Sequence, residues 1–252
     1  MIPGEDLVQV RTTFDLAADS RGTDAGLPAG DEKTALVRSM FDTIAPRYDL
    51  VNRIMTFGLD VGWRKRSVRA LGLPTGSMVL DLACGTGDFL RILSGAGFRP
   101  FGMDLSWGML KANRTGAPLA QANAASLPVA TGGVDGITCG YALRNFTDLV
   151  PAFEEFVRVI RPGGRISILE VSEPDHGLLR AGDRIWFRRV VPIIGGLLSD
   201  RAAYHYLPRS TAYLPPTEEL RSMLNDAGFS SVNQRALSGG LSQLLTATRR
   251  GR

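Results

Sequence analysis

The chain has 252 residues, of which 44% are hydrophobic, enough to form the core of one large α/β domain. Its 29 Lys+Arg and 25 Asp+Glu leave a formal charge of only +4 without a basic tract or a recognisable binding module, so no nucleic-acid partner is expected. Cys84 and Cys139 form no CxxC pair, which indicates neither a disulfide framework nor a metal site. Because no secretory signal and no apolar run of about 20 residues is present, we expect a cytoplasmic protein.

The region before the first predicted strand is expected to be helical, after a mobile leader. Residues 1–32 include a long stretch rich in Ala, Gly, Asp, Ser and Thr, and we expect them to form a mobile N-terminal segment. Apolar residues then recur at helical spacing as far as Leu71, which predicts two or three helices. A single domain is predicted over residues 33–252, with lid elements at about 33–72 and 176–214.

Strands and helices alternate through the rest of the chain. Short apolar runs predict strands at 78–82, 100–104, 117–121, 136–141, 165–171, 231–237 and 243–248. Amphipathic patterns predict helices at 89–93, 108–113, 152–160 and 220–227. This alternation predicts a Rossmann-like α/β fold with a seven-stranded, mostly parallel sheet and an antiparallel final strand, plus the N-terminal helices and a helical lid insertion.

The first predicted strand runs directly into a Gly-x-Gly turn that opens a helix. Because Gly85 and Gly87 lack side chains, the backbone can turn tightly and a ligand can approach it closely. The helix N-terminus that follows presents amide donors and a partial positive charge, which favour a carboxylate or a phosphate. An ordinary turn between a strand and a helix is the alternative interpretation.

An aspartate at the end of the second predicted strand strengthens the ligand-binding interpretation. Asp104 follows Asp81 by 23 residues, about where a nucleoside-binding Rossmann fold places the acid that accepts hydrogen bonds from ribose. By itself, such an aspartate would more often cap a helix. The chain has Leu90 where a dinucleotide fingerprint would have its third glycine, so a ligand smaller than a dinucleotide is favoured.

These segments resemble the motifs of S-adenosylmethionine-dependent methyltransferases over most of the chain. Residues 81–88 resemble motif I, Asp104 resembles the acidic end of motif II, and Asn123-Ala124 resembles the segment that meets the adenine ring. Residues 162–164, Pro-Gly-Gly, are similar to the turn before the fifth strand. The resemblance implies S-adenosylmethionine as cofactor, bound by Asp81, Gly85, Thr86, Gly87, Asp104, Asn123, Ala124 and Gly140.

Further blocks at residues 40–52, 141–148 and 206–210 are similar to the C-methyltransferases of ubiquinone and menaquinone biosynthesis. The resemblance implies methylation of a ring carbon in a demethylmenaquinol or a related prenylated quinol. The chain departs from that family's pattern at Ala142, where glycine is usual, at Gly140, where serine is common, and at Leu245, where histidine often stands. C- or O-methylation of a soluble aromatic or polyketide metabolite therefore stays open, as does a binding or scaffold protein without turnover.

The residues after the fourth predicted strand are candidates for acceptor chemistry. Arg144 and Asn145 are expected at the carboxyl edge of the sheet, where they could hydrogen-bond a developing phenolate, and Tyr48 could complete the cluster from the N-terminal helices. The resemblance implies the same positions at the acceptor site. In the alternative interpretation Arg144 pairs with a surface carboxylate, Asn145 caps a helix and Tyr48 packs.

Residues 178–198 combine a strongly apolar composition with Arg180, Arg184 and Arg188, which lie four apart on one helical face. Such a segment could lie on the inner face of a membrane, with the arginines meeting anionic headgroups, or could be an ordinary lid helix of a soluble enzyme. Peripheral membrane contact is thus one predicted partnership. A homodimer is also compatible with the sequence.

Overall fold

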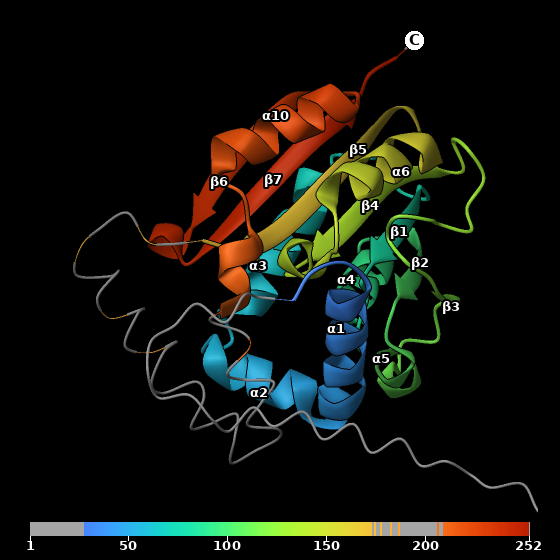
Figure 1. Ribbon diagram of the computed structural model, residues 1–252. Helices are drawn as coiled ribbons and strands as arrows, with labels where there is room; N and C mark the ends of the chain where they lie inside the picture. Colours follow the sequence, from blue (N-terminus) through green and yellow to red (C-terminus); the bar gives the residue numbers. More distant parts are fainter. Residues whose placement is uncertain are drawn as a thin grey trace, which may run out of the picture.

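The computed structural model describes residues 28–172, 174, 177, 182, 186, 206 and 209–251. Within them, a seven-stranded sheet has the order β3-β2-β1-β4-β5-β7-β6 (Figure 1). The strands are β1 Met78–Leu82, β2 Arg99–Asp104, β3 Leu119–Gln121, β4 Val134–Gly140, β5 Ile160–Val171, β6 Phe229–Leu237 and β7 Ser242–Arg249. Strands β1 to β5 pair in parallel, whereas β7 is antiparallel to both β5 and β6. The predicted fold class is confirmed.

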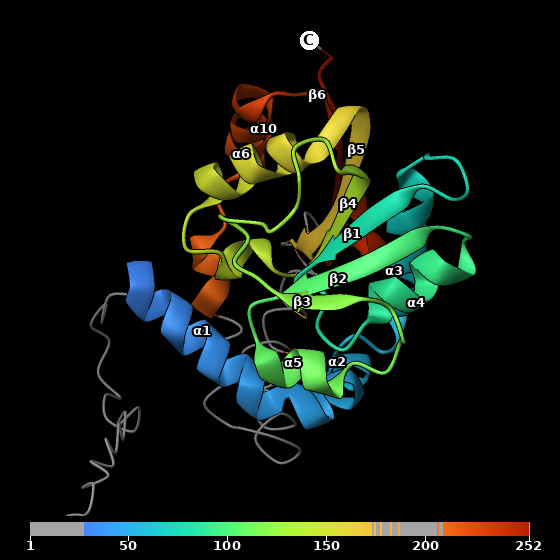
Figure 2. The same ribbon diagram turned by 90° about the vertical axis from the view of Figure 1, so that its right-hand side faces the viewer.

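Helices cover both faces of this sheet and its carboxyl edge. The helices are α1 Gly30–Ile44, α2 Tyr48–Met55, α3 Leu59–Ala70, α4 Asp88–Gly95, α5 Trp107–Ala112, α6 Leu149–Val159 and α10 Thr217–Ala227. Short 3₁₀ turns are η1 Ala45–Arg47, η2 Leu143–Asn145, η4 Thr211–Tyr213 and η5 Ser238–Gly240. Figure 2 shows α6 and α10 on one face and α3 and α4 on the other, with α1, α2 and α5 gathered at the lower end of the view.

Apolar side chains explain these layers. The helix α6 is capped by Asp148, whose carboxylate accepts a hydrogen bond from Val150 N at 2.9 Å. It buries Phe153 and Phe156 completely against the sheet. The opposite face is closed by a second cluster, in which Trp63 and Leu93 pack on the strands from α3 and α4. A third cluster joins α1, α2 and α5 above the carboxyl ends of the strands.

Several element boundaries differ from the prediction. The helix predicted at 152–160 ends one residue earlier, at Val159 of α6. The strand predicted at 165–171 begins earlier, because Ile160 is fully buried and pairs with Val134 as the first residue of β5. Gly163, with φ of 77°, then lies inside the irregular start of this strand. The helix α1 begins at Gly30, so the last residues of the segment expected to be mobile are helical.

Two predictions fall on parts of the chain that the structure does not describe. Most of the predicted mobile segment, residues 1–27, lies outside the described residues, as does most of the predicted lid at 176–214. Of the segment with the spaced arginines, only residues 182 and 186 are described. In the described parts of the chain, no helix has the length and apolar character needed to cross a lipid bilayer.

Candidate active site

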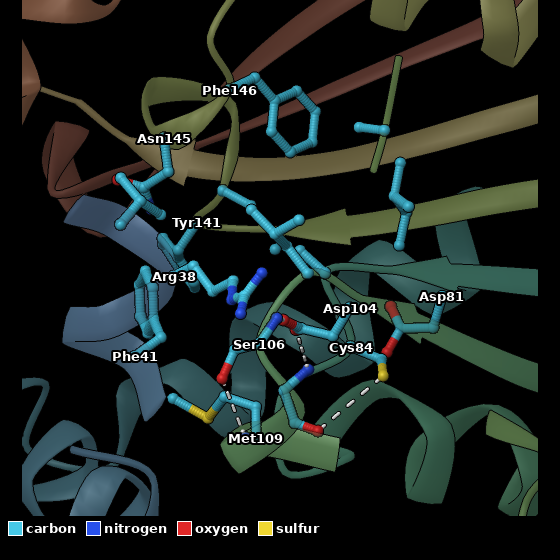
Figure 3. Close-up of a pocket in the computed structure, with 18 of the residues that line it drawn as sticks. Arg38, Phe41, Asp81, Cys84, Asp104, Ser106, Met109, Tyr141, Asn145 and Phe146 are labelled. Atoms are coloured by element: carbon cyan, nitrogen blue, oxygen red, sulfur yellow. Dashed lines mark hydrogen bonds between the residues drawn. The ribbon is translucent and has the colours of Figure 1, made fainter. Parts of the chain in front are cut away.

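A pocket lies at the carboxyl edge of β1, β2 and β4, beneath α1 (Figure 3). Its lining includes the turn after β1, the ends of β2 and β4, the loop at 122–124 and side chains from α1 and α3. Adjacent parallel strands whose crossover helices lie on opposite faces leave a crevice at this edge, where open α/β sheets bind their ligands. The sequence-predicted cofactor and acceptor residues therefore converge on one side of the sheet.

The Gly-x-Gly turn has the strained backbone that its sequence suggests. Ala83, Gly85 and Gly87 have φ of 54°, 52° and 95°, all in the left-handed region. A Cβ on Gly85 would have only Met109 Sδ within 4 Å, at 3.9 Å, so this glycine leaves room at the pocket. Gly87 instead precedes α4 and is not among the pocket-lining residues. A Cβ there would lie 2.4 Å from Thr115 Cγ2, so glycine allows close packing against Thr115.

Asp104 joins the turns that follow β1 and β2. Its Oδ2 accepts a hydrogen bond from Gly85 N and its Oδ1 accepts one from Ser106 N, each at 2.8 Å. Burial raises the pKa of this carboxyl to about 6, although the backbone amide donors act to lower it. Asp104 lines the pocket, and a carboxylate there suits acceptance of hydrogen bonds from hydroxyl groups.

Asp81 has an unused hydrogen-bond acceptor at the pocket. Its Oδ1 accepts from Thr138 Oγ1 at 2.8 Å, whereas its Oδ2 is buried and has no partner among the described residues. Burial raises the pKa of this carboxyl to about 8. An unsatisfied buried acceptor costs about 1–3 kcal/mol, so a ligand that brings a donor here, above all a cationic one, is favoured.

The remaining predicted cofactor residues have distinct settings around the pocket. Asn123 and Ala124 line it, and Asn123 Oδ1 accepts from Ala125 N at 3.0 Å, which fixes their turn. Thr86 also lines the pocket, and its hydroxyl donates to Asp49 of α2. Gly140 lines it at the end of β4.

The departures from the family pattern have local structural explanations. A Cβ at Gly140 would lie 2.6 Å from Phe89 Cε2, so the phenyl ring occupies the space that a serine would need. Ala142 has φ of −122°, which any residue can adopt, so glycine is not required there. Leu245 is fully buried in β7 within the core between the sheet and α6, and it does not line the pocket. The missing histidine therefore leaves the pocket wall unchanged.

The predicted acceptor residues are divided between the pocket and the layer behind it. Tyr48 and Asn145 line the pocket, whereas Arg144 does not. Arg144 is buried and forms an ion pair with Glu170, while its Nη1 also donates to Tyr141 O at 2.8 Å and its Nε to Ser210 Oγ at 3.1 Å. The alternative interpretation had Arg144 paired with a surface carboxylate, whereas its partner is a fully buried carboxylate on β5.

Several functional candidates were missed by the sequence analysis. Glu170 was included in a predicted strand, although a carboxylate in an otherwise apolar buried strand is itself a signal for a buried partner. Arg38 on α1 and Arg64 on α3 also line the pocket, and Figure 3 shows Arg38 extending toward its centre. Their positions depend on how the N-terminal helices pack, which helical spacing alone does not indicate.

The described residues contain no cluster of three His, Cys, Asp or Glu side chains that could hold a metal ion. The two histidines of the sequence are at positions 176 and 205, outside the described residues.

An open α/β sheet with an antiparallel seventh strand, a Gly-x-Gly turn and an acid at the end of β2 defines the Rossmann-like S-adenosylmethionine-dependent methyltransferases. The chain belongs to the ubiE/COQ5 methyltransferase family, whose model matches residues 29–249. It is 41% identical over 221 residues to the ubiquinone/menaquinone biosynthesis C-methyltransferase UbiE of Syntrophotalea carbinolica, covering 84% of this chain and 93% of that protein. It is also 40% identical over 235 residues to the demethylmenaquinone methyltransferase of a Roseiflexus species, covering 89% and 98%.

Solved structures support the same fold at low sequence identity. The [4+2]-cyclase SpnF aligns with a TM-score of 0.64 at 17% identity, covering 90% of this chain and all of that one. A phosphoethanolamine N-methyltransferase of Haemonchus contortus, solved in complex with S-adenosyl-L-methionine, aligns with a TM-score of 0.56 at 13% identity, covering 75% and 53%. The family membership makes this chain an S-adenosylmethionine-dependent methyltransferase. The unpartnered Oδ2 of Asp81 and the open space at Gly85 fit that cofactor.

Proposed function

We propose that this enzyme methylates a ring carbon of a demethylmenaquinol or a related prenylated quinol. The main support from the structure is that one pocket combines an acidic, glycine-lined side with an aromatic side. Asp81 and Asp104 lie on the first, while Phe41 and Phe146 flank the second (Figure 3). The relatives named above as UbiE and demethylmenaquinone methyltransferase support the choice of acceptor.

The cofactor would be held across the ends of β2, β1 and β4. In this proposal Asp104 accepts hydrogen bonds from the ribose hydroxyls, and the turn at Asn123 and Ala124 meets the adenine ring. The backbone at Gly85 and Thr86 borders the methionine part, and Gly140 borders it from β4. Gly87 contributes by allowing the turn to pack closely against Thr115, rather than by contact with the ligand.

When bound, S-adenosylmethionine would supply a sulfonium methyl group for transfer to a ring carbon. The electron pair of the broken bond would stay on sulfur, and the ring carbon would lose its proton to water. The acceptor carbon attacks more readily when a neighbouring hydroxyl is ionised, so the protein must stabilise a phenolate. Asn145 lies on the pocket wall with an amide that can donate to that oxygen. Burial raises the pKa of Tyr48, so its hydroxyl stays protonated near neutral pH and serves as a second donor rather than as a base.

Arg144 is assigned a positioning role in this scheme. Its guanidinium lies behind the pocket, where it binds Glu170 and the carbonyl of Tyr141. These contacts fix the short η2 turn that carries Asn145, whose backbone N–H donates to Ala142 O at 2.9 Å. A fixed turn keeps the amide of Asn145 aimed at the acceptor, and such preorganisation is what transition-state stabilisation requires.

The acceptor can be tested with S-adenosylmethionine labelled in its methyl group and a short-chain demethylmenaquinol. Under reducing conditions we expect the label on a ring carbon, identified by mass spectrometry of fragments. The oxidised quinone is the matched control, because it has no hydroxyl to ionise and should gain no label. Label on oxygen would instead support O-methylation, and absence of label from the reduced substrate would remove prenylated quinols as acceptors.

Peripheral membrane contact is proposed as the route by which a prenylated acceptor reaches the pocket. Four apolar side chains are exposed along α2, the turn after it and the start of α3: Leu50 (56%), Ile54 (37%), Phe57 (72%) and Leu59 (42%). Trp186, from the arginine-containing segment, stacks on Phe57 with ring centroids 4.6 Å apart. Exposed apolar side chains that gather on one surface are typical of proteins that bind to bilayer surfaces.

Replacing both Leu50 and Phe57 with serine should reduce binding to anionic phospholipid vesicles by about tenfold or more, because less apolar area enters the bilayer. Vesicle co-sedimentation measures this change. Val150→Ser is the control, since Val150 is 50% exposed on α6, away from this surface. Equal binding of all three proteins would contradict the proposed membrane contact.

A further inference from the structure

A buried arginine on α3 reaches the pocket beside Asp81, and none of the roles described above uses it. Arg64 is 5% exposed and lines the pocket. Its guanidinium carbon lies 5.8 Å from the ring centroid of Phe89 and 5.5 Å from that of Tyr141, so it is placed between α4 and the end of β4. A charge in this position is costly to bury unless it is paired.

The partners of Arg64 are shared with other cations. Arg64 binds Asp60, which also binds Arg53, and it lies near Asp88, which binds both Arg53 at 2.9 Å and Arg91 at 2.5 Å. Burial acts to raise the pKa of Asp88, but Arg64, Arg53 and Arg91 together hold it below its ordinary value. Both carboxylates are already paired with other arginines, so they do not require the whole guanidinium of Arg64.

Part of the hydrogen-bonding capacity of Arg64 is left for a ligand. Its Nη2 lies 3.6 Å from Asp88 Oδ2, an ion-pair distance that exceeds the reach of a hydrogen bond. The guanidinium has five N–H donors, and those of Nη2 are not consumed by Asp88. Because Asp88 occupies the first turn of α4, its negative charge offsets the attraction of that helix N-terminus for an anion. A carboxylate in this part of the pocket needs a separate cation.

The order of the strands places Arg64 at the end of the pocket opposite to Asp104. Asp104 ends β2, Asp81 lies on the neighbouring β1, and Tyr141, beneath Arg64, follows β4 on the other side of β1. The pocket thus presents, along its length, an acceptor for hydroxyl groups, then an unpartnered buried carboxylate oxygen, then a cation with free donors. A carboxyl oxygen without a partner beside a guanidinium matches the ammonium and carboxylate of an amino acid.

We propose that Arg64 and Asp81 form a binding site for the amino-acid end of S-adenosylmethionine, in which Arg64 binds the carboxylate and Asp81 Oδ2 accepts from the ammonium group. The inference rests on binding of that cofactor in the pocket described above. Opposite charges that are both paired avoid the cost of burying either one alone. Arg64 is thus a specificity-determining residue, which selects ligands that carry an intact amino-acid end.

Two ligands that differ only in that end test the proposal. S-adenosylhomocysteine has the amino-acid end, whereas 5′-methylthioadenosine ends in a methyl group on sulfur. By isothermal titration calorimetry, Arg64→Met should bind S-adenosylhomocysteine about 10- to 100-fold more weakly than the wild type, which corresponds to the loss of a hydrogen-bonded charge pair. Its affinity for 5′-methylthioadenosine should stay within about twofold, because that ligand never meets Arg64. Equal losses for both ligands would show that Arg64 only supports the fold.

Arg53→Met is the matched control. Arg53 binds the same two aspartates as Arg64 but does not line the pocket, so its loss should leave the preference for S-adenosylhomocysteine over 5′-methylthioadenosine unchanged. If Arg53→Met removes that preference to the same extent, the aspartate cluster rather than a direct contact is responsible, and the proposal is wrong.

A change in the ligand avoids any question of folding. The decarboxylated analogue of S-adenosylhomocysteine should bind the wild type as weakly as the intact ligand binds Arg64→Met. In addition, Arg64→Lys keeps the charge and should retain part of the preference for the carboxylate. If the wild type binds S-adenosylhomocysteine and its decarboxylated analogue equally, Arg64 does not recognise a carboxylate, while the cofactor site itself stands. If the wild type binds neither S-adenosylhomocysteine nor 5′-methylthioadenosine, both the cofactor site and this inference fail.

Discussion

Replacing Asp104 with alanine is expected to reduce the affinity for S-adenosylhomocysteine by about 100-fold or more. The variant removes the acceptor that we propose for the ribose hydroxyls. It also releases the amides of Gly85 and Ser106, which Asp104 holds at 2.8 Å. Because the ribose is common to all adenosyl ligands, 5′-methylthioadenosine should lose affinity by a similar factor. Titration calorimetry with both ligands measures the effect.

Asp135→Ala provides the control, because Asp135 is likewise a carboxylate that accepts a hydrogen bond from a backbone amide. Asp135 accepts from Met78 N at 2.6 Å at the opposite end of β1, and it pairs with Arg161. It does not line the pocket, so its loss should leave both affinities within about twofold of the wild type. Near-normal binding of S-adenosylhomocysteine by a folded Asp104→Ala protein would contradict the placement of the ribose at β2.

Replacing Glu170 with leucine is expected to destabilise the protein by about 3–5 kcal/mol, because the buried charge of Arg144 would lose its partner. The side chains of Arg144 and Glu170 are 7% and 0% exposed, and Glu170 also accepts from Val171 N at 2.9 Å. Urea unfolding followed by circular dichroism gives the free energy of unfolding. The midpoint should fall with little change in the slope, since the same surface is exposed on unfolding.

An exposed ion pair supplies the comparison for this effect. Glu218 is 83% exposed where it pairs with Arg221 on α10, so Glu218→Leu should change the free energy of unfolding by about 0.5 kcal/mol or less. The double variant Arg144→Met with Glu170→Leu should regain much of the stability, since no buried charge is then left alone. If Glu170→Leu costs no more than Glu218→Leu, the buried pair is not what holds the η2 turn.

The sequence predicts the alternation of strands and helices, because this alternation depends on local patterns. Apolar runs such as β1 and the face of α6 bury the residues that their spacing predicts, including Phe153 and Phe156. Boundaries were less well defined: β5 begins at Ile160, because this residue pairs with Val134, a partner 26 positions earlier in the chain. Such pairing leaves no signature in the residues that immediately surround it.

The sequence also predicts some residues of the candidate site and not others. Gly85 and Asp104 could be located from the sequence, because a turn that needs glycine and an acid at a strand end are properties of short segments, and parallel strands place their carboxyl ends together. The family was likewise predictable from blocks of adjacent residues. The sequence by itself thus determined the fold class, the cofactor and the general region of the pocket.

Only the tertiary structure decided which charged side chains line the pocket. Arg144, predicted to contact the acceptor, turns instead to Glu170 on β5, and Arg64 reaches the pocket from α3. A long side chain on a helix can point to several neighbours, and the choice depends on which buried charge must be neutralised once the helices have packed. That choice is made by contacts between segments distant in sequence, so no local pattern records it.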